Sequence, residues 1–288
     1  MAARPRTLPA AVAPVLVGTA AAVQGAGELP RLGAFLAALV GSIFIQIGTN
    51  LANDYSDAKR GADTADRLGP VRVTSTGLVT PQRVLRATWV AFAVAVACGI
   101  YLAAVAGPVI LLIGVVSIAA GVLYTGGPRP YGYAGLGEVF VFLFFGLVAV
   151  NGSYYVQLEE LAALPLGLSI ALGFLATAIL VVNNVRDAET DRRAGKMTLA
   201  VRIGRSKAAQ LYELLVLGAF LALPISIWAG DTQWWPLLGL LALPLAVKPI
   251  KVVRSHTDGP ALNGALAATG ALLGVFSLLV TVGLLIAA

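Results

Sequence analysis

The stretch NLANDYSDAKRGAD, residues 50–63, closes a long apolar run with a cluster of carboxylates and amides. A second stretch, NNVRDAETDRRAGKMTL at residues 183–199, follows another apolar run and repeats part of that spacing. The two align at an offset of 130 residues, which pairs Asp57 with Asp187. Carboxylates three or four residues apart lie on one face of a helix. The pattern therefore predicts two helix ends that each present a small acidic cluster.

The composition is that of a protein embedded in a membrane. Of the 288 residues, 58% are hydrophobic and only 12% are charged, whereas a soluble domain averages about 25% charged residues. Apolar runs of about 17 to 25 residues can cross a bilayer as helices. We therefore predict an all-α, polytopic membrane protein with a single transmembrane domain over residues 1–288. The runs give nine predicted spans, at residues 8–24, 33–52, 83–105, 108–125, 136–153, 162–184, 208–229, 235–250 and 262–286.

The basic residues indicate the orientation of these spans. If the N-terminus is cytoplasmic, nine spans put every one of the 20 lysines and arginines except Arg31 on the cytoplasmic side. Cytoplasmic loops carry such an excess of basic residues. The net charge of +6 is then a basic rim that faces anionic headgroups and anionic substrates, not a nucleic-acid surface. The lone Cys98 and the lone His256 exclude an internal disulfide and argue against a site built from several cysteines or histidines.

The two acidic stretches also predict an internal repeat. Spans one to four and five to eight read as two parallel four-helix units, each with an acidic motif after its second helix. Hard cations such as Mg²⁺ take oxygen ligands, typically one or two carboxylates together with substrate phosphates. Ordinary acidic residues at a hydrated helix end are the alternative interpretation. The candidate metal ligands and catalytic acids are Asp54, Asp57, Asp187 and Asp191, with Asp63 as a further metal ligand.

Cations are interleaved with these acids and predict diphosphate binding. Lysine and arginine beside metal-binding carboxylates are suited to neutralising a departing diphosphate. Each of them can equally be a simple orientation signal. Arg72 and Lys196 are favoured because each lies in a segment rich in glycine and threonine, where the backbone can approach a ligand closely. The candidates for diphosphate binding in these two loops are Lys59, Arg60, Arg72 and Lys196.

A third loop, YTGGPRPYGYAGLGE at residues 124–138, is short and rich in glycine. It offers one cation, Arg129, and three phenolic hydroxyls, those of Tyr124, Tyr131 and Tyr133. A tight turn with tyrosines at the membrane interface would explain the same sequence. Its spacing alone does not identify a site.

Taken together, these three loops resemble the UbiA superfamily of intramembrane aromatic prenyltransferases, and most closely its menaquinone branch. That branch carries NDxxDxxxGxD, seen here at residues 53–63, and DxxxDxxxGKxTL, seen at residues 187–199. It also carries a YTGGPxP…GLGE loop, seen at residues 124–138. The segments RPRTLP (4–9) and TGLVTP (76–81) are similar to it too. Other quinone branches usually have DxxxD where Gly61 stands, which favours menaquinone over ubiquinone.

The resemblance implies a nine-helix bundle around a central cavity that opens sideways to lipid. It implies Mg²⁺ held between the aspartate motifs and a polyprenyl diphosphate, which transfers its chain to 1,4-dihydroxy-2-naphthoate with loss of CO₂. It also implies a multi-pass protein of the bacterial cell (inner) membrane. Carried onto matching positions, it adds three asparagines, Asn53, Asn183 and Asn184, to the diphosphate site, and it places Tyr124, Arg129 and Tyr131 around the acceptor.

Three alternatives stay open at this point. Within the family, the acceptor could be 4-hydroxybenzoate or homogentisate. A transporter would require ionisable residues near the bilayer centre, whereas nearly all charges here lie at span ends. A CDP-alcohol transferase would carry its acids in one continuous motif, not in two motifs 130 residues apart.

Overall fold

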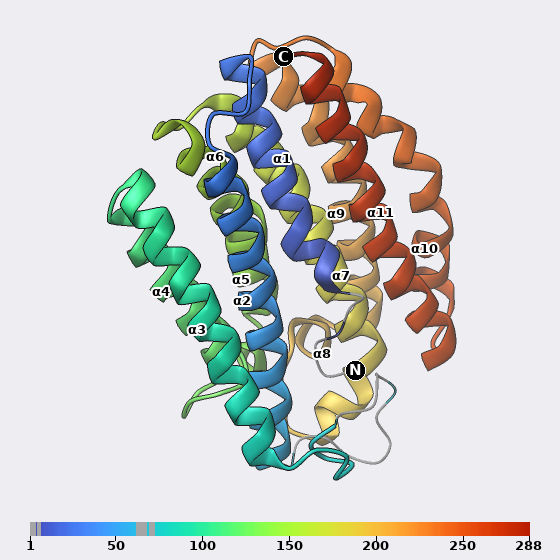
Figure 1. The fold of residues 1–288 in the computed structure, drawn as a ribbon. Coiled ribbons are helices and arrows are strands. Elements are labelled where there is room, and N and C mark those ends of the chain that lie inside the picture. The colour runs from blue at the N-terminus through green and yellow to red at the C-terminus, as the bar shows by residue number, and fades with distance from the viewer. Residues whose placement is uncertain (1–3, 5–6, 62–67, 69–72) are drawn as a thin grey trace.

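The computed structural model of the chain describes residues 4, 7–61, 68 and 73–288, and these form an elongated bundle of helices (Figure 1). The elements in chain order are α1 (Leu8–Ala26), α2 (Leu32–Lys59), α3 (Pro81–Ala106), α4 (Val109–Leu123), the 3-10 helix η2 (Tyr131–Ala134), α5 (Gly137–Val141), the π-helical η3 (Phe142–Val148), α6 (Ala149–Leu158), α7 (Ala163–Arg193), α8 (Leu199–Ile203), α9 (Arg205–Ala229), the 3-10 helix η4 (Trp235–Ala242), α10 (Leu243–Ser255) and α11 (Gly259–Ile286).

The prediction of an all-α membrane fold is confirmed. Within the described ranges, eight helices are long and apolar enough to cross a membrane, and α5, η3 and α6 together make one of them. The predicted span at 108–125 corresponds to α4, which has only 15 residues. At 1.5 Å per residue α4 is about 22 Å long, so it is shorter than the hydrocarbon core of about 30 Å.

Helix α7 forms the centre of the larger, well-packed part of the bundle. It contacts α9, α11, α1 and α6, and its buried leucines and valines join those of the neighbouring helices in one continuous apolar core. Helices α2, α3 and α4 stand to the side of this core in Figure 1. Only two small apolar clusters, around Leu102 and around Leu51, involve these three helices in the described part of the chain. The helices around α7 therefore share a large buried apolar core, whereas α2, α3 and α4 are packed by much smaller apolar clusters.

One close helix contact depends on glycine. Gly146 in η3 lies against Gly173 in α7, and a Cβ at position 146 would be 2.6 Å from the Gly173 Cα and 2.7 Å from the Ser169 carbonyl oxygen. Such distances leave no room for a side chain. The π-helical turn carries this contact and continues a span whose Phe140 and Phe144 lie on the cavity wall.

The polar motifs meet at one end of the bundle. Helices α2 and α7 both end there, near α8 and the start of α1, while the C-terminus lies at the opposite end (Figure 1). At the opposite end Arg31 ties three segments together, because its Nη1 donates to the carbonyl oxygens of Val105 and Val156 at 3.3 Å and its backbone N–H donates to Gln157 at 2.9 Å. The single basic residue predicted for that side therefore has a structural contact.

Candidate active site

A cavity of about 790 Å³ begins at the polar end and continues into the apolar part of the bundle. Acids, amides and phenols from both motifs and from the third loop meet at its polar end. The predicted site residues that line it are Asn53, Asp54, Asp57, Tyr124, Tyr131, Asn183, Asn184, Asp187, Asp191 and Lys196.

Most of the remaining wall is apolar or aromatic. Small and aliphatic side chains of α2, α3 and α4 form one side, including Cys98, Leu102 and Ile113. On the other side the rings of Tyr131 and Phe140 stack with centroids 3.9 Å apart, and Phe144 continues the stack at 6.1 Å from Phe140. The cavity thus has a charged mouth, at the polar end of the bundle, and a mostly apolar interior.

Some predicted site residues lie elsewhere. Lys59, Arg60 and Arg129 are exposed and do not line the cavity, and the Arg60 guanidinium donates to the Gly127 carbonyl oxygen. Asp63 and Arg72 lie outside the described residues. The cavity-lining cations of the described chain are Lys196 and Arg4, and Arg4 belongs to the N-terminal motif.

The first acidic motif is held by short polar contacts. Asp57, which is 1% exposed, accepts a hydrogen bond from the Tyr133 hydroxyl at 2.6 Å and forms an ion pair with the Lys196 ammonium at 3.4 Å. The Lys196 ammonium also lies 5.0 Å from the centre of the Tyr133 ring. The three loops predicted from sequence therefore meet at one carboxylate.

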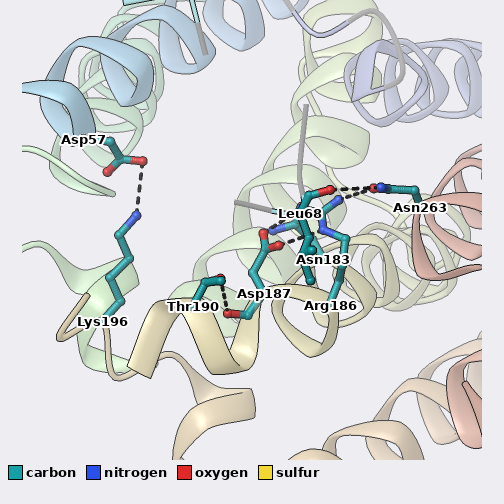
Figure 2. A network of polar contacts seen from close by, with 8 residues as sticks. All are labelled: Asp57, Leu68, Asn183, Arg186, Asp187, Thr190, Lys196 and Asn263. Carbon is teal, nitrogen blue, oxygen red and sulfur yellow. Dashed lines mark hydrogen bonds and ion pairs between the residues drawn. The ribbon is translucent and has the colours of Figure 1, made fainter. Parts of the chain in front are cut away.

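The end of α7 explains why Lys196 reaches Asp57. The Gly195 N–H donates to the Arg192 carbonyl oxygen and the Lys196 N–H donates to the Asp191 carbonyl oxygen, at 3.1 and 2.8 Å. This pair of bonds is a Schellman motif, which needs a left-handed residue after the helix. Gly195 supplies it with φ +74°. The chain then turns back toward α2, as Figure 2 shows for the Lys196 side chain.

The second acidic motif is organised by a buried arginine. The Arg186 guanidinium binds both carboxylate oxygens of Asp187, at 2.8 and 2.6 Å, and its side chain is 0% exposed. It also donates to Asn183 Oδ1 at 2.8 Å and to Asn263 Oδ1 of α11 at 2.7 Å. The Asn263 amide in turn donates to the Leu68 carbonyl oxygen at 3.0 Å (Figure 2). Through Asn263 of α11, Arg186 of α7 is thus linked to Leu68 in the α2–α3 connection.

The loop tyrosines are set to act as hydrogen-bond donors. Burial raises the pKa of the Tyr124 phenol well above its ordinary value, and the negative charge of Glu138 raises it further. Burial also raises the pKa of Tyr131, whose hydroxyl donates to the Ala120 carbonyl oxygen at 2.8 Å. Both phenols therefore stay protonated throughout the neutral pH range.

The donor set fits a hard cation only with help from a substrate. Within the described residues, no three His, Cys, Asp or Glu side chains are grouped so that they could hold a metal ion. Asp54 nevertheless has one buried oxygen, Oδ1, that no hydrogen bond satisfies among the described atoms. A buried unpaired carboxylate oxygen is costly. Carboxylate and amide oxygens with phosphate oxygens completing the shell are the ligand set that Mg²⁺ prefers.

The likeness to known proteins agrees with this geometry. A model of the UbiA prenyltransferase family matches residues 11–262. The chain belongs to this family. It is 42% identical over 279 residues to the 1,4-dihydroxy-2-naphthoate octaprenyltransferase of Mycobacterium tuberculosis, covering 96% of this chain and 93% of that protein. It is 40% identical over 278 residues to the Escherichia coli protein of the same name, covering 94% and 90%.

Solved UbiA structures share the fold at low sequence identity. A UbiA homolog from Archaeoglobus fulgidus superposes with a TM-score of 0.68 at 17% identity, covering 98% of this chain and 97% of that one. A UbiA homolog from the same organism bound to GPP and Mg²⁺ gives a TM-score of 0.62 at 17% identity, with coverage of 97% and 98%. The chain is accordingly a multi-pass UbiA membrane protein.

Several polar contacts of this UbiA site were not foreseen. The pairings of Asn184 with Glu138 and of Asn53 with Thr125, at 2.9 and 2.8 Å, join segments far apart in sequence. Asn263 is a further partner of this kind. The signal in the sequence was the placement of polar residues near the ends of apolar spans, since such residues normally face the interior of a bundle. Their partners could not be read from spacing.

Proposed function

We propose that this UbiA protein transfers a polyprenyl group from polyprenyl diphosphate to 1,4-dihydroxy-2-naphthoate, with loss of CO₂, to give a demethylmenaquinol. The observation that carries the proposal is that both aspartate motifs line the charged end of one cavity whose remaining wall is mostly apolar. A diphosphate and a hydrocarbon chain are the two halves of the donor substrate, and the cavity offers each a matching surface. The names of the bacterial relatives support the choice of acceptor.

The residues at the mouth would bind and orient the diphosphate. Asp54, Asp57, Asp187 and Asp191 would hold Mg²⁺, which neutralises the charge of the diphosphate as it leaves. Lys196, whose ammonium lies beside Asp57, would bind the diphosphate oxygens. Positive groups that are already in position stabilise developing negative charge without reorganisation. Ionisation of the allylic C–O bond is thereby favoured.

The apolar wall would protect the allylic cation from water. The stacked rings of Tyr131, Phe140 and Phe144 present π-faces that attract a cation. The ring carbon that bears the acceptor carboxylate then forms the new C–C bond, and that carboxylate leaves as CO₂. The electrons of the broken C–O bond stay with the diphosphate, so the charges balance without another reactant.

The site is proposed to lie at the cytoplasmic face of a bacterial cell (inner) membrane. The clustering of basic residues at the polar end of the bundle supports this orientation. Water-soluble naphthoate and the diphosphate group would then be reached from the cytoplasm, while the prenyl chain stays in the bilayer.

One reconstitution tests the function and its nearest alternatives. Purified full-length protein in nanodiscs is given a long-chain prenyl diphosphate and, in separate reactions, 1,4-dihydroxy-2-naphthoate, 4-hydroxybenzoate or homogentisate, each with Mg²⁺ or with a chelator. We expect a prenylated naphthoquinol and stoichiometric release of labelled CO₂ only with naphthoate and metal. Consumption of another acid in place of naphthoate would reject the assigned acceptor, and full turnover in chelator would reject the metal.

A further inference from the structure

Two adjacent asparagines in α7 line the cavity, and each is held by a buried charged side chain of opposite sign. The Asn184 amide nitrogen donates to Glu138 Oε1 at 2.9 Å. The Asn183 amide oxygen accepts from Arg186 Nη2 at 2.8 Å. The same residue type at neighbouring positions is thus engaged through opposite ends of its amide.

The charged partners decide which amide atom is left for a ligand. The oxygen and nitrogen of an amide are hard to tell apart, and a network of hydrogen bonds must assign them. A carboxylate can only accept and a guanidinium can only donate. Glu138 therefore turns Asn184 Oδ1 away from itself, and Arg186 leaves Asn183 with its N–H groups available.

Helix geometry lets both partners act at once. Successive helical residues differ by about 100° around the axis, so Asn183 and Asn184 have different neighbours although both reach the cavity. Arg186 is three residues after Asn183 and lies on the same face of α7. Glu138 is the second residue of α5, which contacts α7 from another side.

The burial of Glu138 indicates a role beyond packing. Glu138 is 6% exposed and Asn184 is 5% exposed, and Glu138 Oε2 has no hydrogen-bond partner among the described atoms. An unsatisfied charged oxygen at such a position destabilises the fold. A leucine would fill a similar volume without that cost, so the carboxyl group is suited to a task that needs a hydrogen-bond acceptor, as in its contact with Asn184.

We propose that Glu138 and Arg186 are positioning residues that give the two asparagines different tasks. Asn184 presents Oδ1 as an oxygen ligand for a divalent cation, and Asn183 presents its N–H groups to diphosphate oxygens. The inference rests on the proposed function in that it takes a cation and a diphosphate as the occupants of this mouth. It is independent of which aromatic acid is the acceptor.

Binding measurements test the inference without turnover. Full-length protein in nanodiscs is titrated with Mn²⁺, followed by paramagnetic resonance, at saturating inorganic pyrophosphate. We expect E138L to weaken Mn²⁺ binding about 10- to 100-fold, as loss of a partner that orients a metal ligand does. The control Y212F removes a buried hydrogen bond between α9 and α11, of 2.7 Å to Thr269, and should lower the unfolding temperature while leaving Mn²⁺ binding unchanged.

The two asparagines provide a matched pair of variants. N184L should weaken Mn²⁺ binding at saturating pyrophosphate, whereas N183L should weaken pyrophosphate binding at fixed Mn²⁺ and leave the Mn²⁺ affinity of the pyrophosphate complex unchanged. The reverse assignment, or equal effects on both ligands, would overturn the division of tasks.

An exchange variant covers the case in which E138L does not fold. In E138Q/N184D, the amide introduced on α5 donates to the carboxylate introduced on α7. That carboxylate still offers an oxygen to the cavity, so Mn²⁺ should bind at least as tightly as in the wild-type protein. A folded exchange variant that binds no Mn²⁺, or an E138L protein with wild-type Mn²⁺ affinity and only a lower unfolding temperature, would reject the inference. Failure of the wild-type protein to prenylate naphthoate would reject the proposed function and leave these binding results standing.

Discussion

Replacing Asp187 with alanine should destabilise the fold and stop the reaction for separable reasons. The change removes the two hydrogen bonds that the Arg186 guanidinium makes to this carboxylate, and the Arg186 side chain is 0% exposed. Removing one partner of a buried ion pair costs about 3–5 kcal/mol. The Asn183 and Asn263 oxygens remain as acceptors, so we expect the lower end, about 3 kcal/mol, or roughly a hundredfold in the folding equilibrium constant.

A charge-free double variant separates the two effects. Replacing a buried ion pair with apolar residues of similar volume is often neutral for stability. R186M/D187L should therefore regain part of the unfolding temperature lost in D187A, since the Asn183 and Asn263 oxygens lose the Arg186 donor. It should remain inactive, because the carboxylate is still missing. Both quantities are measured on the same nanodisc preparations, by thermal unfolding and by product formation.

A surface pair provides the matched control. Arg254 and Glu213 form an ion pair of 3.0 Å with side chains 58% and 26% exposed, and pairs of this kind contribute about 0–1 kcal/mol. E213A should thus change neither stability nor turnover appreciably. An unchanged unfolding temperature in D187A would refute the claim that the buried Arg186–Asp187 pair stabilises the fold. Turnover by R186M/D187L would show that Asp187 is not part of the active site.

Three further outcomes follow from the described contacts. K196M should lower the rate constant of the chemical step, measured in single-turnover assays, about 10²- to 10³-fold, which is the loss typical of removing one positioned group that stabilises developing charge. Because the pKa of Tyr124 is raised, the unfolded state loses this proton first, so stability should fall as the pH rises above about 10; Y124F should reduce that fall in unfolding temperatures recorded from about pH 9 to 11. Arg4 lines the cavity and Arg129 does not, so R4L should raise the KM for the aromatic acid about tenfold and R129L should leave it near the wild-type value, as steady-state kinetics would determine.

The fold was accessible from the sequence because its signals are local. Each span is a run of apolar residues, and each acidic motif ends such a run, so helices, their order and the common end of α2 and α7 could all be predicted. These features depend on residues that are neighbours in the chain.

The inner arrangement of the site was not accessible, because it depends on contacts between distant segments. Nothing in the spacing of residues 183–199 distinguishes Arg186, which is buried on Asp187, from the exposed Arg192 and Arg193. The prediction that Arg129 borders the acceptor came from the family resemblance, and the exposed position of Arg129 follows from how the third loop folds. Glu138 and Asn184 are 46 positions apart and meet only through the packing of α5 on α7.

The difference in apolar packing between the two parts of the bundle has a consequence for how proteins with this fold can evolve. The side of the cavity formed by α3 and α4 includes small residues such as Gly99 and Gly114 and is not part of the large apolar core around α7. Changes of volume on that side alter the room for a hydrocarbon tail and leave the packing of α7, which carries the second acidic motif, on α9 and α11 in place. Related proteins could therefore adapt to isoprenoids of different size through substitutions on the α3 and α4 side of the cavity, while the reaction itself stays the same.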